Sequence, residues 1–138
     1  MNNLPVFIVD DDLDDHYLID EIWKELDLKN PLLFFNSARE LLTHMKQNPD
    51  KPPFIIISDV NLPNTDGFEL REILLKDESA KYKSIPFIFW SEKASESQIK
   101  KAYDLSAHGF FIKENTVQEI KKTFQSIIEY WLKSKIPA

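Results

Sequence analysis

The sequence predicts an α/β fold, in which helices cover both faces of a doubly wound, five-stranded parallel sheet. Five short apolar runs of strand length recur along the chain, and the segments between them carry apolar residues at helical spacing. The run Phe54–Ile57 is wholly apolar and three of its residues are β-branched, which is typical of a strand buried on both faces at the sheet centre. The 138 residues favour a single domain, spanning 1–138.

The first half of the chain alternates strand and helix signals. Val6–Val9 predicts a buried strand, and the spacing of the apolar residues after it predicts a helix from about Asp14 to Leu28. Leu32–Phe35 predicts the next strand. The Asn36-Ser37 pair offers an N-cap for a second helix, which has to end before Pro49 because the residue before a proline disfavours helical geometry. The central strand follows.

The second half repeats this alternation. Either residue of the Thr65-Asp66 pair can begin a third helix, and Ile85–Trp90 predicts a fourth strand, since a proline is tolerated near the start of a strand. Apolar residues over Ile99–Leu105 mark a fourth helix, and Gly109–Ile112 predicts the fifth strand. A long amphipathic helix is expected from about Thr116 to Ser134.

Composition and charge exclude several classes of function. The formal net charge of −6 argues against a nucleic-acid binder that works by neutralising phosphates. The chain has no cysteine, which excludes disulfides, thiolate metal sites and cysteine nucleophiles. Its apolar runs are too short to span a membrane, and its start lacks the basic and apolar regions of a signal peptide. We therefore expect a cytoplasmic protein that binds neither nucleic acid nor membranes.

Charged and hydroxyl side chains follow four of the predicted strands: Asp10 and Asp11 the first, Asp59 the third, Ser91 the fourth and Lys113 the fifth. Because the carboxyl ends of parallel strands meet at one edge of the sheet, these side chains are expected to lie together where α/β folds bind ligands. Two carboxylates about 4 Å apart repel by roughly 4 kcal/mol at an effective dielectric constant near 20. A cation must offset this charge, or a carboxylate must take up a proton.

All-oxygen ligation favours Mg²⁺ or Mn²⁺ at this edge of the sheet. Lys113 would add a fixed positive charge, and Ser91 would add a hydroxyl donor. Together with a divalent ion, these groups would stabilise the equatorial oxygens of a phosphoryl group in transfer. Asp59 is then the nucleophile, and its product is an aspartyl-phosphate.

The same residues resemble a known family. The pattern Asp10-Asp11, then Asp59–Pro63 with Asp66-Gly67, then Ser91 and Lys113, is similar to the receiver domain of two-component response regulators. The resemblance covers essentially the whole chain. It implies a flavodoxin-like fold with strand order 2-1-3-4-5, phosphorylation of Asp59 by a sensor histidine kinase, and a stand-alone receiver without an output domain.

The resemblance also implies a role for each site residue. The implied ligands of Mg²⁺ (or Mn²⁺) are the side chains of Asp11 and Asp59, Asp10 through water, and the backbone carbonyl of Asn61. Ser91 and Lys113 would contact the phosphoryl group. Phe110 matches the switch aromatic, whose rotamer follows Ser91. Phosphorylation would then alter the loop after the fourth strand and the surface of the fourth helix, fifth strand and fifth helix, where a downstream protein or phosphotransfer protein binds.

Two residues depart from the family pattern. Glu92 follows Ser91, where the family usually has a small residue, and Glu114 follows Lys113, where the family usually has a proline joined by a cis bond. A phosphorylation-independent pseudo-receiver therefore stays open as the alternative function. The end of the last helix, Glu129–Pro137, is similar to the tails of small receivers that partner bacterial phytochromes. This similarity suggests a phytochrome or another sensor kinase as partner, and a homodimer through the fourth and fifth helices.

Two further classes share parts of the pattern. The spacing Asp10-x-Asp12-x-Asp14 faintly resembles the haloacid dehalogenase motif of Mg²⁺-dependent phosphohydrolases, but residue 14 departs from that motif and such enzymes usually need a longer chain. A nucleotide- or flavin-binding module would hold phosphate with Gly, Ser or Thr amides after the first strand, where this chain has carboxylates. Asp12, Asp14 and Asp15 are expected only to cap and solubilise the first helix.

Overall fold

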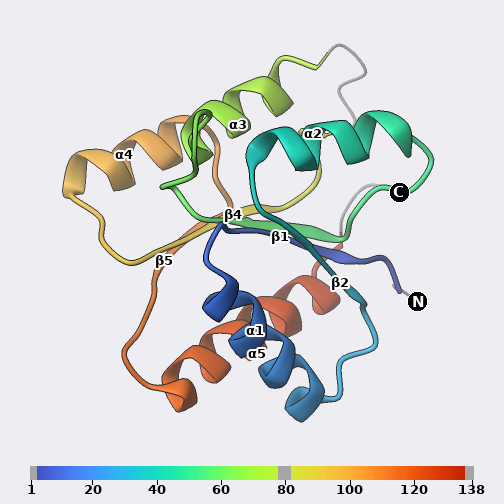
Figure 1. The fold of residues 1–138 in the computed structure, drawn as a ribbon, viewed down its shortest axis with the longest axis vertical. Coiled ribbons are helices and arrows are strands. Elements are labelled where there is room, and N and C mark those ends of the chain that lie inside the picture. The colour runs from blue at the N-terminus through green and yellow to red at the C-terminus, as the bar shows by residue number, and fades with distance from the viewer. Residues whose placement is uncertain (1–2, 78–81, 136–138) are drawn as a thin grey trace.

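The structure is a computed structural model that describes residues 3–77 and 82–135. Within these ranges, the chain forms a sheet of five parallel strands in the order β2-β1-β3-β4-β5 (Figure 1). Both the parallel sheet and its strand order are as predicted. The strands are β1 (Val6–Val9), β2 (Leu32–Phe35), β3 (Ile55–Ser58), β4 (Phe87–Ser91) and β5 (Gly109–Ile112).

Helices cover both faces of this sheet, as expected of a doubly wound fold. Figure 1 shows α1 and α5 against one face, and α2, α3 and α4 against the other. The helices are α1 (Leu13–Leu26), α2 (Ala38–Gln47), α3 (Gly67–Leu75), α4 (Glu96–Asp104) and α5 (Val117–Lys133). In the two described ranges, no helix is long and apolar enough to cross a membrane.

Side-chain caps set where the helices begin. Of the two pairs of candidates, Ser37 caps α2 and Asp66 caps α3, and Asp66 forms a capping box with Glu69. Helix α1 ends two residues earlier than predicted, because Asp27 adopts a left-handed conformation (φ 51°) and its N–H bonds back to the last turn. The caps of the other three helices are Asp12, Ser95 and Thr116.

Strand β4 begins and ends later than predicted. It spans Phe87–Ser91 instead of Ile85–Trp90. Pro86 has no N–H to give the sheet and contributes only its carbonyl, which accepts a hydrogen bond from the Ile56 N–H at 2.9 Å. The shift makes Ser91 the last residue of the strand rather than the first residue of the following loop.

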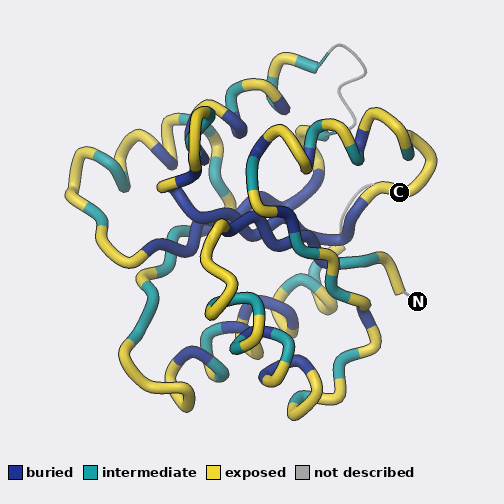
Figure 2. Tube along the Cα trace, viewed as in Figure 1, coloured by how far each residue is buried: buried dark blue, intermediate teal, exposed yellow. Residues whose placement is uncertain are grey.

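The sheet divides the apolar core into two layers. Strands β1, β3 and β4 are buried along their whole length, while the outer faces of the helices are exposed (Figure 2). Alternate residues of the central strands supply the two layers: Phe7 and Ile56 belong to the layer under α2, α3 and α4, and Ile8 and Ile57 to the layer under α1 and α5. The prediction that the central strand is buried on both faces is confirmed.

Candidate functional site

Two buried aspartates lie at the carboxyl edge of the sheet. Asp10 follows β1 and Asp59 follows β3, and these two strands pair in register up to Val9 and Ser58. The Asp59 N–H donates to the Val9 carbonyl at 2.9 Å, which extends the ladder by one residue. Asp10 is 1% exposed and Asp59 is 8% exposed. Carboxylates buried to this extent are costly unless a cation meets them.

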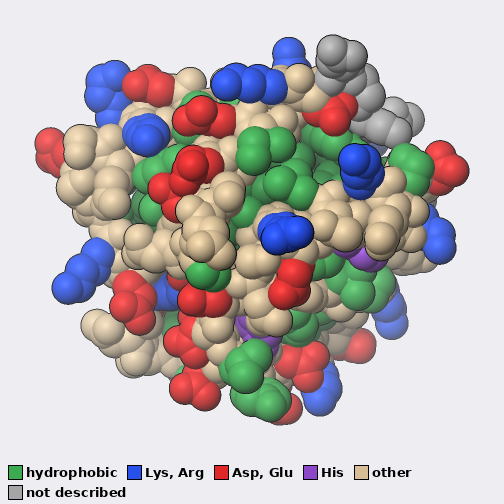
Figure 3. Space-filling view, turned by 45° about the horizontal axis from the view of Figure 1, so that its top comes forward, with side chains coloured by type: hydrophobic (Ala, Val, Ile, Leu, Met, Phe, Trp, Pro, Cys, Tyr) green, Lys and Arg blue, Asp and Glu red, His purple; other side chains and the backbone are tan. Residues whose placement is uncertain are grey.

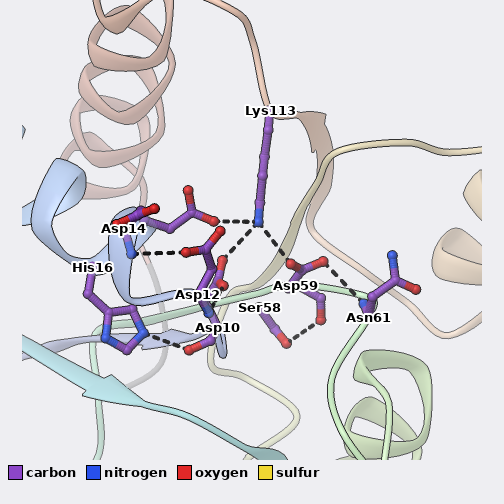
Figure 4. A network of polar contacts seen from close by, with 9 residues as sticks. Asp10, Asp12, Asp14, His16, Ser58, Asp59, Asn61 and Lys113 are labelled. Carbon is purple, nitrogen blue, oxygen red and sulfur yellow. Dashed lines mark hydrogen bonds and ion pairs between the residues drawn. The ribbon is translucent and has the colours of Figure 1, made fainter.

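Lys113 supplies that cation. It follows β5, and its backbone N–H donates to the Ser91 carbonyl at 2.8 Å. Its ammonium donates to Oδ2 of Asp10 at 2.9 Å, and to Oδ2 of Asp15 and of Asp59, each at 2.8 Å (Figure 4). An ammonium has three N–H donors, so these three carboxylates occupy all of them. Three of the residues predicted from the strand ends therefore do meet.

The charges of this cluster do not balance, because one ammonium faces three carboxylates. Burial raises the pKa of Asp10 to about 7, although the Asp12 N–H and the Lys113 ammonium act in the opposite direction. Burial also opposes the charge of Lys113, but its hydrogen bonds to Asp15 and Asp59 and the charge of Asp10 outweigh burial and raise its pKa. With these pKa values, Lys113 is protonated near neutral pH, and Asp10 is protonated in part of the molecules.

The acidic excess reaches the surface. Figure 3 shows acidic side chains spread over the visible face, many of them in its lower half, with basic side chains at its edge and near its centre. Lys113 adds little to that surface, since its side chain is only 9% exposed. Lys113 is therefore about as deeply buried as Asp59, and less deeply than Asp10.

Contacts on both sides orient the Asp59 carboxylate. Its Oδ1 accepts the Asn61 N–H at 3.1 Å, and its Oδ2 accepts from Lys113. The Asp59 carbonyl accepts a hydrogen bond from the Ser58 hydroxyl at 2.8 Å. Gly67 begins α3 against the same carbonyl, and a Cβ at that position would collide with the carbonyl oxygen. Helix α3 can therefore start this close to the end of β3 only with glycine at its first position.

Ser91 and Phe110 lie on the neighbouring strands β4 and β5. Ser91 is fully buried, and its hydroxyl is among the buried polar atoms of the described residues that have no hydrogen-bond partner. A buried hydroxyl without a partner is costly, so an acceptor placed beside it would gain a hydrogen bond. Phe110 is half-buried and packs against Phe89, with ring centroids 5.7 Å apart.

The predicted metal ligands converge only in part. Asp10 and Asp59 share one cation, whereas Asp11 and Asn61 are exposed. The described ranges contain no group of three Asp, Glu, His or Cys side chains already arranged to hold a metal ion. Two carboxylates that converge on a cation nevertheless form an oxygen donor set of the kind that Mg²⁺ and Mn²⁺ take. The residues fit such an ion, provided that Lys113 releases part of its contacts.

Asp15 belongs to the site, and the expectation that it only caps and solubilises the first helix is wrong. Its carboxylate accepts a hydrogen bond from the Lys113 ammonium. Asp12 does cap α1, as expected. A signal for Asp15 exists in the sequence. It precedes the buried residues Ile19 and Ile22 by four and seven positions, so it lies on the inward face of α1.

The two departures from the family pattern leave Lys113 in place. Peptide bonds in the described ranges are trans, including the bond between Lys113 and Glu114. Glu114 accepts a hydrogen bond from Thr123 of α5 at 2.5 Å, which ties the segment after β5 to that helix. Glu92 is exposed and lines a cleft of about 380 Å³, together with Asp15 and Lys113.

Comparison with known proteins places this chain in a family. The response regulator receiver domain model matches residues 6–125, and the chain belongs to that family. Rcp1, a response regulator of Synechocystis, is 23% identical over 94% of this chain and 89% of its own length. FilR2 of Methanothrix harundinacea, a probable methanogenesis regulatory protein, is 28% identical over 80 residues, which are 58% of this chain and 50% of FilR2.

Solved structures share the whole fold. The phosphorylated cyanobacterial phytochrome response regulator RcpA matches with a TM-score of 0.88 and 24% identity, over 99% of this chain and 100% of its own. A Mn²⁺-bound structure of Rcp1 matches with a TM-score of 0.84 and 23% identity, over 98% and 99%. The flavodoxin-like receiver fold is confirmed. Receiver domains are signalling domains of two-component systems. They accept phosphate from histidine kinases and bind a divalent metal ion.

Proposed function

We propose that this chain is a stand-alone receiver that takes a phosphoryl group from a sensor histidine kinase onto Asp59. The observation that carries the proposal is the orientation of the Asp59 carboxylate, which the Asn61 N–H and the Lys113 ammonium hold from either side at 3.1 and 2.8 Å. A carboxylate held in one orientation at the end of the central strand is suited to act as a nucleophile. The match to 89% of the length of Rcp1, a response regulator, supports the receiver role.

The proposed transfer exchanges one bond to phosphorus for another. A carboxylate oxygen of Asp59 attacks the phosphorus of a phosphohistidine, and the O–P bond forms as the P–N bond breaks. The imidazole leaves with the bonding electrons and takes up a proton. Negative charge then gathers on the equatorial phosphoryl oxygens, where the Lys113 ammonium and the unpaired Ser91 hydroxyl are the proposed donors.

The proposed ligands of Mg²⁺ or Mn²⁺ are the side chains of Asp11 and Asp59, Asp10 through water, and the backbone carbonyl of Asn61. When bound, such an ion neutralises charge on the transferring phosphoryl group. Asp10 contributes through its ionised form, and because burial raises its pKa to about 7, it must lose a proton to do so. The same groups are proposed to support self-catalysed phosphotransfer and autodephosphorylation.

The surface of α4, β5 and α5 is the proposed output of the switch. Ser91 is the last residue of β4 and Phe110 is the second residue of the neighbouring strand β5, and their rearrangement is proposed to alter the β4–α4 loop. Large apolar side chains are exposed on each of the three elements: Tyr103 at 53%, Ile112 at 42% and Val117 at 53%. A downstream protein or a second copy of the chain would bury them. The likeness to RcpA supports a phytochrome as the kinase partner.

Intact-mass measurement tests the acceptor. The chain is incubated with acetyl phosphate and Mg²⁺, then with a histidine kinase that carries labelled phosphate. We expect a gain of one phosphoryl group that requires the metal and is lost in Asp59→Asn, but not in Asp14→Asn, which removes an exposed charge nearby. Folded wild-type protein that accepts no phosphoryl group from either donor would refute the proposal and favour the pseudo-receiver.

A further inference from the structure

Lys113 holds one carboxylate that lies outside the proposed metal ligands. Asp15 comes from the first turns of α1, and its Oδ2 is 2.8 Å from the Lys113 ammonium. Its side chain is 18% exposed, so the contact is shielded from water far more than an ordinary surface ion pair. The other two carboxylates on Lys113, Asp10 and Asp59, are the ones that a metal ion would engage.

We propose that Asp15 is a positioning residue that holds the Lys113 ammonium while a metal ion engages Asp10 and Asp59, and that it competes with the phosphoryl group for the same ammonium. The second half of this inference rests on the proposed function of Asp59. The first half requires only that the chain binds a divalent ion.

The argument for metal binding starts from the three occupied N–H donors of Lys113. A divalent ion that takes oxygens from Asp10 and Asp59 must compete with this ammonium for them. With Asp15 present, Lys113 keeps one buried carboxylate that the ion does not need. Without Asp15, the ammonium is left with only the oxygens that the ion requires. Asp15 therefore favours metal binding, both through its own charge and through its hold on Lys113.

The effect on phosphoryl transfer has the opposite sign. The Lys113 side chain is 9% exposed and its ammonium lies 4.8 Å from the centre of the Trp90 ring, so its available acceptors are the neighbours already described. A phosphoryl group on Asp59 draws the ammonium toward its own oxygens, and the hydrogen bond to Asp15 opposes that movement. Removing the Asp15 charge removes this opposing pull and also lowers the repulsion felt by an anionic phosphodonor.

A Mg²⁺ titration of Asp15→Asn against Asp14→Asn tests the first effect. Both variants remove one charge from the same turn, but Asp14 is exposed and is not one of the three carboxylates on Lys113. The indole N–H signal of Trp90 in NMR spectra, assigned with Trp90→Phe, follows the ammonium above its ring. We expect the Mg²⁺ dissociation constant to rise about fivefold to tenfold in Asp15→Asn and less than about twofold in Asp14→Asn. Asp15→Glu should restore much of the affinity.

The second effect is measured with acetyl phosphate at saturating Mg²⁺. Asp15→Asn should be phosphorylated about twofold to fivefold faster than wild type, and its phosphorylated form should last longer. A merely structural role for Asp15 would lower metal affinity and phosphorylation together. When Lys113 is also replaced by Gln, Asp15→Asn and Asp14→Asn should change the Mg²⁺ dissociation constant and the phosphorylation rate equally, because Asp15 acts through the ammonium.

Several outcomes would overturn the inference. The first is that Asp15→Asn has the same Mg²⁺ dissociation constant as Asp14→Asn. The second is that its metal affinity and its phosphorylation rate fall together. The third is that Asp15→Asn still has a larger effect than Asp14→Asn when Lys113 is replaced by Gln. If wild-type protein accepts no phosphoryl group from any donor, the proposed function fails and the competition with phosphate fails with it. The Mg²⁺ titration needs no phosphoryl group, so it still decides whether Asp15 holds Lys113 for the metal.

Discussion

Replacing Asp10 by asparagine should stabilise the protein above pH 7 and change its stability little below pH 4. Asp10 is 1% exposed, and burial raises its pKa from 3.8 to about 7. A group whose pKa is raised on folding contributes stability that is present in full below its unfolded pKa and is lost as pH rises through its folded pKa. The difference between 7 and 3.8, about three units, corresponds to roughly 4 kcal/mol.

The gain in the variant is smaller than this figure. Lys113 loses a charged acceptor, and a hydrogen bond to a charged group contributes roughly 1.5–3 kcal/mol, of which the asparagine oxygen recovers a part. We therefore expect Asp10→Asn to be more stable than wild type by about 2 kcal/mol at pH 8. The advantage should shrink as the pH falls from 7 toward 4, because wild-type Asp10 becomes neutral as well.

Urea denaturation in EDTA at pH 4, 6 and 8 measures this difference, with Asp11→Asn as the control. Asp11 is an exposed neighbour, and its replacement should change the free energy of unfolding by less than about 0.5 kcal/mol at each pH. A variant less stable than wild type at pH 8, or a difference that does not change with pH, would refute the reasoning. The first result would mean that the Asp10–Lys113 pair outweighs burial, and the second that the pair only balances burial.

Three further substitutions follow from the same contacts. Lys113→Met should lower the free energy of unfolding by about 3 kcal/mol at pH 8, because it leaves buried carboxylates without a cation, and most of that loss should be recovered at pH 5 in urea melts. Gly67→Ala should cost more than about 2 kcal/mol in the same assay, since its Cβ would collide with the Asp59 carbonyl; a neutral result would mean that α3 shifts freely. Glu92→Ala should speed phosphorylation by acetyl phosphate about twofold in stopped-flow measurements, with the difference shrinking at high salt, and an unchanged rate would mean that the Glu92 charge does not reach the donor.

The fold could be predicted because hydrophobic pattern and turn chemistry agree along the chain. The bounds of β1, β2 and β5 match the predicted runs to the residue. The error at β4 has a local cause, since apolar character extends over Ile85 and Pro86, but only residues with an N–H can join both sides of a ladder. Similarly, the end of α1 depends on the left-handed Asp27, which apolar spacing does not report.

The site could be predicted as far as strand ends determine it. Asp10, Asp59 and Lys113 meet because parallel strands in register bring their carboxyl ends to one edge. Asp15 depends instead on how α1 packs against the sheet, which brings a helix residue to a strand-end lysine 98 positions away. The hydrogen bond between Glu114 and Thr123 has the same origin, since it depends on where α5 crosses the end of β5.

The charge excess at Lys113 connects proton, metal and phosphoryl group through a single set of donors. Loss of the Asp10 proton adds negative charge beside the ammonium, a bound divalent ion would withdraw oxygens from it, and the proposed phosphorylation of Asp59 would move negative charge to new oxygens. Each event changes which partners the ammonium holds. The Lys113 N–H is bonded to the Ser91 carbonyl at 2.8 Å, so such a change acts where β4 and β5 end together. Phe110 lies on β5, three residues before Lys113, so a change at the ammonium can reach the surface of α4, β5 and α5 through a short stretch of backbone.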